Sequence, residues 1–410
     1  MTVFETECRE RVGQLRSAFI ELYDSVGADP ASPQDVARNF RVNKTLAWNV
    51  ARLLQASDAL AAVNHVPGAS SLEKVIQATA RKGADATIVA RARKAVQEFK
   101  QMIEDHAGDR STLDLIIDGT GRGSESRLEL SRKLAFRGNS GLYGVQAQTR
   151  VLCHFLAPNP DDPAQLDMAT VSGYVGFRRL RPGVRWPIFM VRAWSERKDA
   201  LVGPGWQPLE RTEESTNGFP IMRSFTRGDA PKVNPMDTPE GRDYVLTDGP
   251  VGNEGAFDCF WGEHMRGAAA RYAGAPGETG EFGAAITAPV EHLVSDIIVH
   301  RSLDFALKPE VLVFGQIFAH GRKTGGAEDP SLLPIRQSTN ELPGSPPLVN
   351  TALVPKYPSI VRHVYQRMGW NAAEFHGVRL LMEYPPLGAN IIMRFPLPVA
   401  PQTNATLRTV

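Results

Sequence analysis

Cysteine, long apolar runs and an excess of one charge are all scarce in this sequence of 410 residues. Its three cysteines, Cys8, Cys153 and Cys259, are too few and too widely spaced for a disulfide framework or a thiolate zinc site, and they favour a reducing compartment. No apolar run approaches the roughly 18 residues that a membrane helix needs. The first residues, MTVFETECRERVGQLRS, carry acidic side chains where a secretory leader has an apolar core. We therefore expect a cytoplasmic protein that makes no contact with a membrane.

The formal net charge of +1 gives by itself no reason to expect a polyanionic partner. The charges are unevenly distributed, however. Residues 31–100 contain eleven Lys or Arg against five Asp or Glu, and the segments on both sides are acidic. A basic island inside a near-neutral chain is typical of a nucleic-acid-binding segment.

The length of the chain indicates two or three domains. Apolar residues recur at helical spacing almost without interruption to about residue 107 and at strand spacing afterwards, with helices at about 261–273 and 358–370. We expect an α+β protein, with an all-α domain at 1–109 and a larger, mainly antiparallel α+β domain at 110–410. Glycine and proline predict long loops at 203–280 and 321–349. The runs that read as strands are 113–118, 168–178, 185–194, 293–300, 311–318, 377–384 and 389–396.

Residues 32–54, SPQDVARNFRVNKTLAWNVARLL, predict two short helices joined by a tight turn. Ser32 and Pro33 suit the start of a helix over about 33–40, and Asn43 can cap a second helix that ends near residue 55. Two helices joined so closely need a small residue where they cross, and Ala37 supplies it. The apolar residues that we expect in their shared core are Val36, Phe40, Val42, Leu46, Val50 and Leu53.

This segment resembles the helix-turn-helix of bacterial transcriptional regulators, over about 22 residues. The resemblance implies that the second helix enters the major groove, where Asn and Arg read base edges while Lys and Thr commonly reach phosphates. The sequence departs from the pattern at Arg41, where a glycine is usual, and at Ala47, which is smaller than the usual branched residue. Trp48 fits a buried core position as well as a groove-facing one. The residues carried over as DNA contacts are Asn43, Lys44, Thr45, Trp48, Asn49 and Arg52.

Two further features surround this unit. Lys82 and Arg91 belong to a basic run that either follows phosphates beside the second helix or forms an ordinary solvated helix face. The apolar seam from Val89 to Ile103 either pairs two subunits as a short coiled coil or packs onto the domain's own core.

The rest of the sequence predicts no catalytic, cofactor or metal site. The run GTGRGS at 119–124 lacks the spacing and the lysine of a phosphate-binding loop. His292, Asp296 and His300 share one face of an expected strand, but their spacing is not diagnostic of a metal site.

We expect a transcriptional regulator that binds double-stranded DNA as a homodimer or higher homo-oligomer. Its C-terminal domain would oligomerise or sense a small-molecule effector. Two alternatives come from other classes. The first alternative is a structural or assembly protein whose helical domain packs on protein partners. The second is an enzyme of unfamiliar type in residues 110–410.

Overall fold

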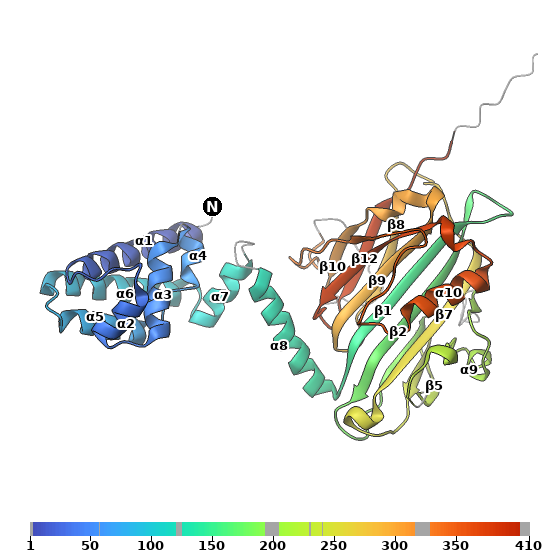
Figure 1. The fold of residues 1–410 in the computed structure, drawn as a ribbon, viewed down its shortest axis with the longest axis horizontal. Helices are drawn as coiled ribbons and strands as arrows, with labels where there is room; N and C mark the ends of the chain where they lie inside the picture. The colour runs from blue at the N-terminus through green and yellow to red at the C-terminus, as the bar shows by residue number, and fades with distance from the viewer. Residues whose placement is uncertain are drawn as a thin grey trace, which may run out of the picture. The chain divides into compact units, whose positions relative to one another are not determined.

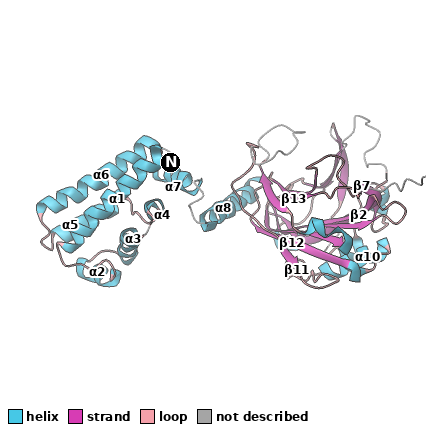
Figure 2. Cartoon of the chain, turned by 90° about the horizontal axis from the view of Figure 1, so that it is seen from above, coloured by secondary structure: helices cyan, strands magenta, loops and turns pink. Residues whose placement is uncertain are grey.

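The computed structural model describes residues 3–56, 58–119, 125–192, 205–228, 231–239, 241–315 and 329–401 (Figure 1). The chain divides into two compact units, Met1–Leu128 and Glu129–Val410. Helices precede the sheet region, which confirms the α+β class (Figure 2). The division at Leu128 lies beyond the expected boundary at residue 109, because one more helix packs into the first core.

The described part of the first unit contains helices and no strand. On the longest of these helices, four apolar residues at three- and four-residue spacing are fully buried: Val12, Leu15, Phe19 and Leu22. This stripe packs into one core with residues from the other helices. The helices are α1 (Val3–Asp24), α2 (Pro33–Phe40), α3 (Lys44–Gln55), α4 (Ala59–Val63), α5 (Ala69–Ala80), α6 (Ala86–His106) and α7 (Arg110–Gly119).

The expectation of a strand at 113–118 is wrong, because this run lies inside α7. A short apolar run fits a buried strand or a buried helix equally well, so its pattern could not decide. Leu113 and Ile117 are four residues apart on one side of the helix, and both are fully buried in the first core. Arg110 ties the start of α7 to the end of α4 by donating to the carbonyl of Val63, and to the residues that follow by donating to that of Val66.

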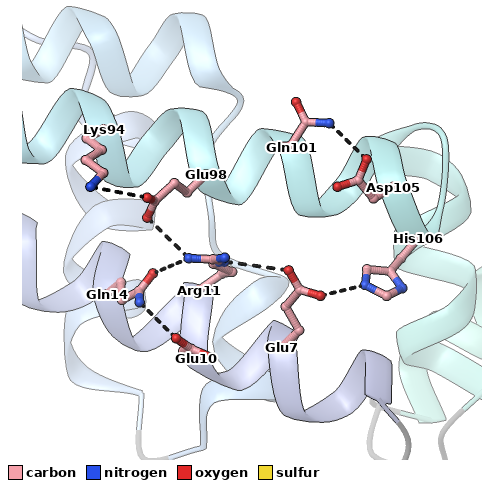
Figure 3. Close-up of polar contacts among 9 residues, drawn as sticks. All are labelled: Glu7, Glu10, Arg11, Gln14, Lys94, Glu98, Gln101, Asp105 and His106. Atoms are coloured by element: carbon pink, nitrogen blue, oxygen red, sulfur yellow. Dashed lines mark hydrogen bonds and ion pairs between the residues drawn. The ribbon is translucent and has the colours of Figure 1, made fainter.

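A polar network joins α1 to α6 (Figure 3). Arg11 on α1 donates to Glu98 on α6, with an N–O distance of 3.4 Å. Glu7 lies between Arg11 and His106, and its carboxylate is 2.8 Å from Nε2 of His106. These contacts balance the charges along this pair of helices within the unit itself.

The second unit is built around a seven-stranded sheet with the order β11-β12-β9-β1-β2-β7-β4. Every neighbouring pair in it is antiparallel except β1 and β9, which are parallel. Two three-stranded sheets, β10-β13-β8 and β3-β6-β5, complete the unit. The strands are β1 (Val145–Pro158), β2 (Gln165–Arg179), β3 (Pro187–Arg192), β4 (Gln207–Pro208), β5 (Val233–Thr238), β6 (Gly241–Leu246), β7 (Phe257–Ala270), β8 (Thr279–Ala285), β9 (Val290–His300), β10 (Glu310–Phe314), β11 (Asn340–Leu342), β12 (Phe375–Glu383) and β13 (Asn390–Pro396).

Helix α10 (Tyr357–Met368), where a helix was expected, packs on one face of the large sheet (Figure 1). Its buried residues Ile360 and Val364 share a core with Phe155 of β1 and Ile298 of β9. Two other helices belong to this part of the chain, α8 (Glu125–Tyr143) and the short α9 (Glu213–Thr216). Among the described helices, none is long and apolar enough to cross a membrane.

Two expectations for the second unit are wrong. The helix expected at 261–273 is for the most part strand β7, because pairing with β2 and burial of Cys259, Phe260 and Trp261 outweigh the helical preference of its alanines. The loop expected at 203–280 contains β4, α9, β5, β6, all of β7 and the start of β8. Strand β1, at the centre of the sheet, was not predicted.

Candidate nucleic-acid interface

The two helices of the predicted unit begin and end where the sequence indicated. Pro33 is the first residue of α2, and Asn43 caps α3 by accepting a hydrogen bond from the Thr45 amide at 2.8 Å. Ser32 occupies the cap position of α2, but its hydroxyl donates to Asp29 instead of capping the helix. The expected cap of α3 is therefore confirmed, and that of α2 is not.

The turn between the helices has a left-handed residue at Arg41, with φ 53° and ψ 41°. This is the region of backbone conformation that glycine adopts without strain. The Arg41 and Val42 amides both bond to the carbonyl of Ala37, which closes the end of α2. Arg41 thus adopts the left-handed conformation that a glycine usually adopts in the turns of helix-turn-helix proteins.

One side of the two helices is buried as predicted. Val36, Ala37, Val50 and Leu53 have exposed fractions of 6% or less. Ala47 is buried as well, so its small side chain lies against the core. Phe40, Val42 and Leu46 are partly buried and pack against the same cluster. The predicted core of this segment is confirmed.

The opposite side of α3 is a polar surface, which we call the α3 strip. The side chains of Lys44, Thr45, Trp48 and Arg52 are exposed, and Asn49 is partly exposed between them. Positions three, four and seven apart lie on one face of a helix, so these residues form one continuous strip. Trp48 has an exposed fraction of 46%, which decides between its two possible positions in favour of the surface. Asn43 lies at the start of the strip, with its side-chain oxygen engaged in the cap.

The charge of this segment is largely uncompensated. Residues 33–55 carry four cationic side chains and one carboxylate, Asp35, which pairs with Arg38. No ion pair is found for Arg41, Lys44 or Arg52 within the residues that the structure describes. The N-terminus of α3 adds a partial positive charge next to Lys44. The strip therefore presents positive charge to solvent.

The basic run on α5 and α6 differs in this respect. Arg91 pairs with Glu21 at 2.5 Å, and Arg93 pairs with Glu73 at 2.9 Å. Lys94 and Lys100 have glutamates four residues further along α6. Lys82 is exposed in the turn after α5. Most of this run is thus a helix face with its own counter-charges, although exposed pairs such as Arg91–Glu21 contribute little and exchange readily with water.

The Val89–Ile103 seam packs within its own unit. Val89, Ala92 and Phe99 are buried in the first core, with Val96 and Ile103 partly buried against it. The spacing allowed either a coiled coil between subunits or packing onto the domain's own core, and the structure shows the packing onto the core.

In the second unit, the residues considered for metal binding have other partners. Asp296 is fully buried and forms two hydrogen bonds with Arg379, at 2.9 and 2.7 Å. His300 accepts from the Ser302 amide at the end of β9. Among the described residues, no group of three or more His, Cys, Asp or Glu could hold a metal ion. The GTGRGS run lies almost entirely outside the described residues.

The sequence gives no sign that two titratable groups of this unit share one row across the large sheet. Glu263 of β7 and His154 of β1 oppose Thr170 of β2 from its two sides, which makes a polar row across three strands. Burial raises the pKa of Glu263 to about 7 and lowers that of His154 to about 3. The lowered pKa keeps His154 neutral, and its ring stacks on Phe282. Strand β7 lies about 100 residues from β1 in the sequence, so no local motif marks this row.

No protein-family model matches the chain, and no curated protein matches it.

Proposed function

We propose that the first unit binds double-stranded DNA through α3 and that the protein is a transcriptional regulator. The observation that carries this proposal is the α3 strip, a polar and positively charged helix face opposite a fully packed core. The centre of a protein–protein interface is depleted of charged residues, whereas this face carries the exposed Lys44 and Arg52.

The side chains of the strip suit the major groove. Asn49 and Arg52 can each make two hydrogen bonds to a base edge, to adenine and guanine respectively. Lys44 and Thr45 lie in the first turn of α3, next to the positive end of the helix dipole, where phosphate oxygens are favoured. The half-exposed Trp48 offers an apolar surface to a thymine methyl group. A role on DNA implies a cytoplasmic location.

The first test is binding of the full-length protein to genomic DNA fragments over a range of salt concentrations, followed by sequencing of the retained fragments. We expect a recurrent sequence among them. The affinity should fall linearly on a double logarithmic plot against salt, because each phosphate contact releases counterions.

The second test separates base contacts from phosphate contacts on the recovered sequence. Asn49→Ala and Arg52→Ala should each weaken binding by about 1–3 kcal/mol and relax the sequence preference, because an edge contact forms only on the right base. Lys82→Ala and Arg91→Ala should weaken all sequences alike and lower the salt slope by about one unit. Binding is measured by fluorescence anisotropy on matched and scrambled duplexes.

Arg362→Ala is the control, since it removes one exposed positive charge from α10 in the second unit. It should bind like wild type. Circular dichroism must show that every variant keeps its helices, because α3 also builds the core. If all four test variants fold and bind like the control, α3 is a packing surface and the proposal is wrong.

A further inference from the structure

The small sheet β3-β6-β5 has one face on which apolar and charged residues are segregated. In an antiparallel sheet, directly opposed residues point to the same side. Phe189, Tyr244 and Pro235 form one such row across the three strands. Val191, Arg242 and Asp237 form the next row, at the end of the sheet where β5 turns into β6. This face is therefore apolar in the middle and charged at one end.

The segment after α9 covers only part of this face. Phe219 stacks on Tyr244, with ring centroids 5.5 Å apart, and the Tyr244 hydroxyl donates to the carbonyl of Asn217 at 2.8 Å. Gly218 allows this approach, because a Cβ there would lie 2.3 Å from the Tyr244 oxygen. Phe219 also stacks on Phe189, so the backbone of the covering segment is fixed against the sheet by two aromatic stacks and one hydrogen bond.

A cavity of about 490 Å³ remains between the covering segment and the sheet face. Its size lies in the range of small-molecule sites, about 300–1,000 Å³. Apolar surface comes from both sides of it, and the polar lining includes Asn217 and Thr216. The apolar lining residues are Val191, Phe219, Val233, Pro235 and Tyr244.

Among the described residues, Arg242 and Glu214 are the charged ones that line the cavity, and they differ in how their charge is balanced. Glu214 is paired with Arg223. Arg242 donates through Nε to Asp237 at 2.7 Å, but the side chain of Asp237 is 73% exposed. Such a pair is weakened by water and contributes little. A guanidinium has five N–H donors, so a second anion can bind Arg242 beside Asp237 or in its place.

We infer that this cavity binds a small organic anion, with an apolar body against Phe219, Tyr244 and Pro235 and a carboxylate on Arg242. The Tyr244 hydroxyl is uncharged at neutral pH and donates to the Asn217 carbonyl, and burial raises its pKa further. A cation would meet Arg242 at that end and find Glu214 already paired. The inference concerns the second unit alone and does not depend on DNA binding by the first.

The test is calorimetric titration of the full-length protein with phenylacetate and with phenylacetamide, which has nearly the same shape but no charge. We expect phenylacetate to bind about tenfold more tightly than the amide, because only the acid forms a charge-assisted pair with Arg242. Arg242→Gln should abolish this preference, so that this variant binds phenylacetate and phenylacetamide with about the same affinity. Arg301→Gln, which breaks the surface pair with Glu374 in the same unit, is the matched control and should leave it unchanged.

Asp237→Asn is predicted to strengthen binding of the anion, a result that a folding defect cannot produce. It removes the carboxylate that competes for Arg242, so phenylacetate should bind several times more tightly to this variant than to wild type. Pro235→Trp places a bulky ring over the apolar wall and should abolish binding. The inference is overturned if acid and amide bind alike, if neither binds at millimolar concentration, or if Arg242→Gln binds phenylacetate like wild type.

Discussion

Arg41 stands where the helix-turn-helix pattern has a glycine, yet its backbone adopts the left-handed conformation typical of that glycine. Its φ of 53° lies where a side chain is strained, by roughly 1–2 kcal/mol for an L-residue. The side chain is exposed, and no ion pair for it is found in the described part of the chain. If α3 binds DNA as proposed, the positive charge that Arg41 adds beside it is a reason to keep a strained residue at this turn.

Arg41→Gly should therefore raise the free energy of unfolding of the first unit by about 1 kcal/mol, since relief of the strain exceeds the extra entropy of the unfolded glycine chain. It should also weaken DNA binding, because one cation beside the strip is lost. Urea unfolding followed by circular dichroism measures the first effect.

The control is Arg38→Gly, inside α2, which should lower stability by about 1 kcal/mol because glycine disfavours a helix interior. Equal destabilisation by both substitutions would show that the turn does not require a left-handed residue.

At the residue scale, much of the candidate site could be predicted from sequence because its signals are local. The cap at Asn43, the proline at Pro33 and the three- and four-residue spacing along α3 are all set by neighbours within one turn. The counter-charges could not be predicted in this way. Glu21 and Arg91 lie 70 residues apart in the sequence, and packing of the helices brings them together.

At the element scale, the sequence predicted the helices of the first unit better than the strands of the second. A helix satisfies its own backbone, so its period appears in the sequence. Strand β7 depends on its partners, and a run with glutamate, histidine and arginine becomes a strand because β2 and β4 flank it. Strand β1 is buried on both faces in its second half, so it lacks the alternation that marks an exposed sheet.

Glu263 on β7 predicts a specific dependence of stability on pH. Its pKa is about 7 in the folded protein and near 4.5 in the unfolded chain, because burial disfavours the charged form. Between these values the folded state holds a proton that the unfolded state has released. The stability that Glu263 contributes is therefore full below pH 4.5 and is lost as the pH rises towards 7.

Glu263→Gln, which cannot ionise, should remove this part of the pH dependence. We expect the free energy of unfolding of wild type to fall relative to that of the variant between pH 5 and about 7, and then to level off. Urea unfolding at a series of pH values measures it, with Glu278→Gln as the control on an exposed loop. Parallel curves for wild type and Glu263→Gln would contradict the raised pKa of Glu263.

At the scale of the whole molecule, a regulator with one short recognition helix per chain gains affinity when two half-sites are engaged together. We therefore expect light scattering at micromolar concentration to report about twice the chain mass of 44.9 kDa. The Val89–Ile103 seam is buried and cannot supply this interface. Phe99→Ala should accordingly destabilise the first unit without dissociating the dimer. A monomer under these conditions would count against the regulator.

The parallel pairing of β1 with β9 has a consequence for the order in which the chain folds during synthesis. The two central strands are paired through residues more than 130 positions apart, and β12 joins β9 only after about 75 further residues. Closing such long loops is slow, whereas the helices of the first unit are joined by short connections. The first unit can therefore complete its core while the ribosome is still making the sheet. Until β9 and β12 emerge, β1 and β2 expose apolar strand edges, so the nascent second unit is the part of this protein most exposed to aggregation.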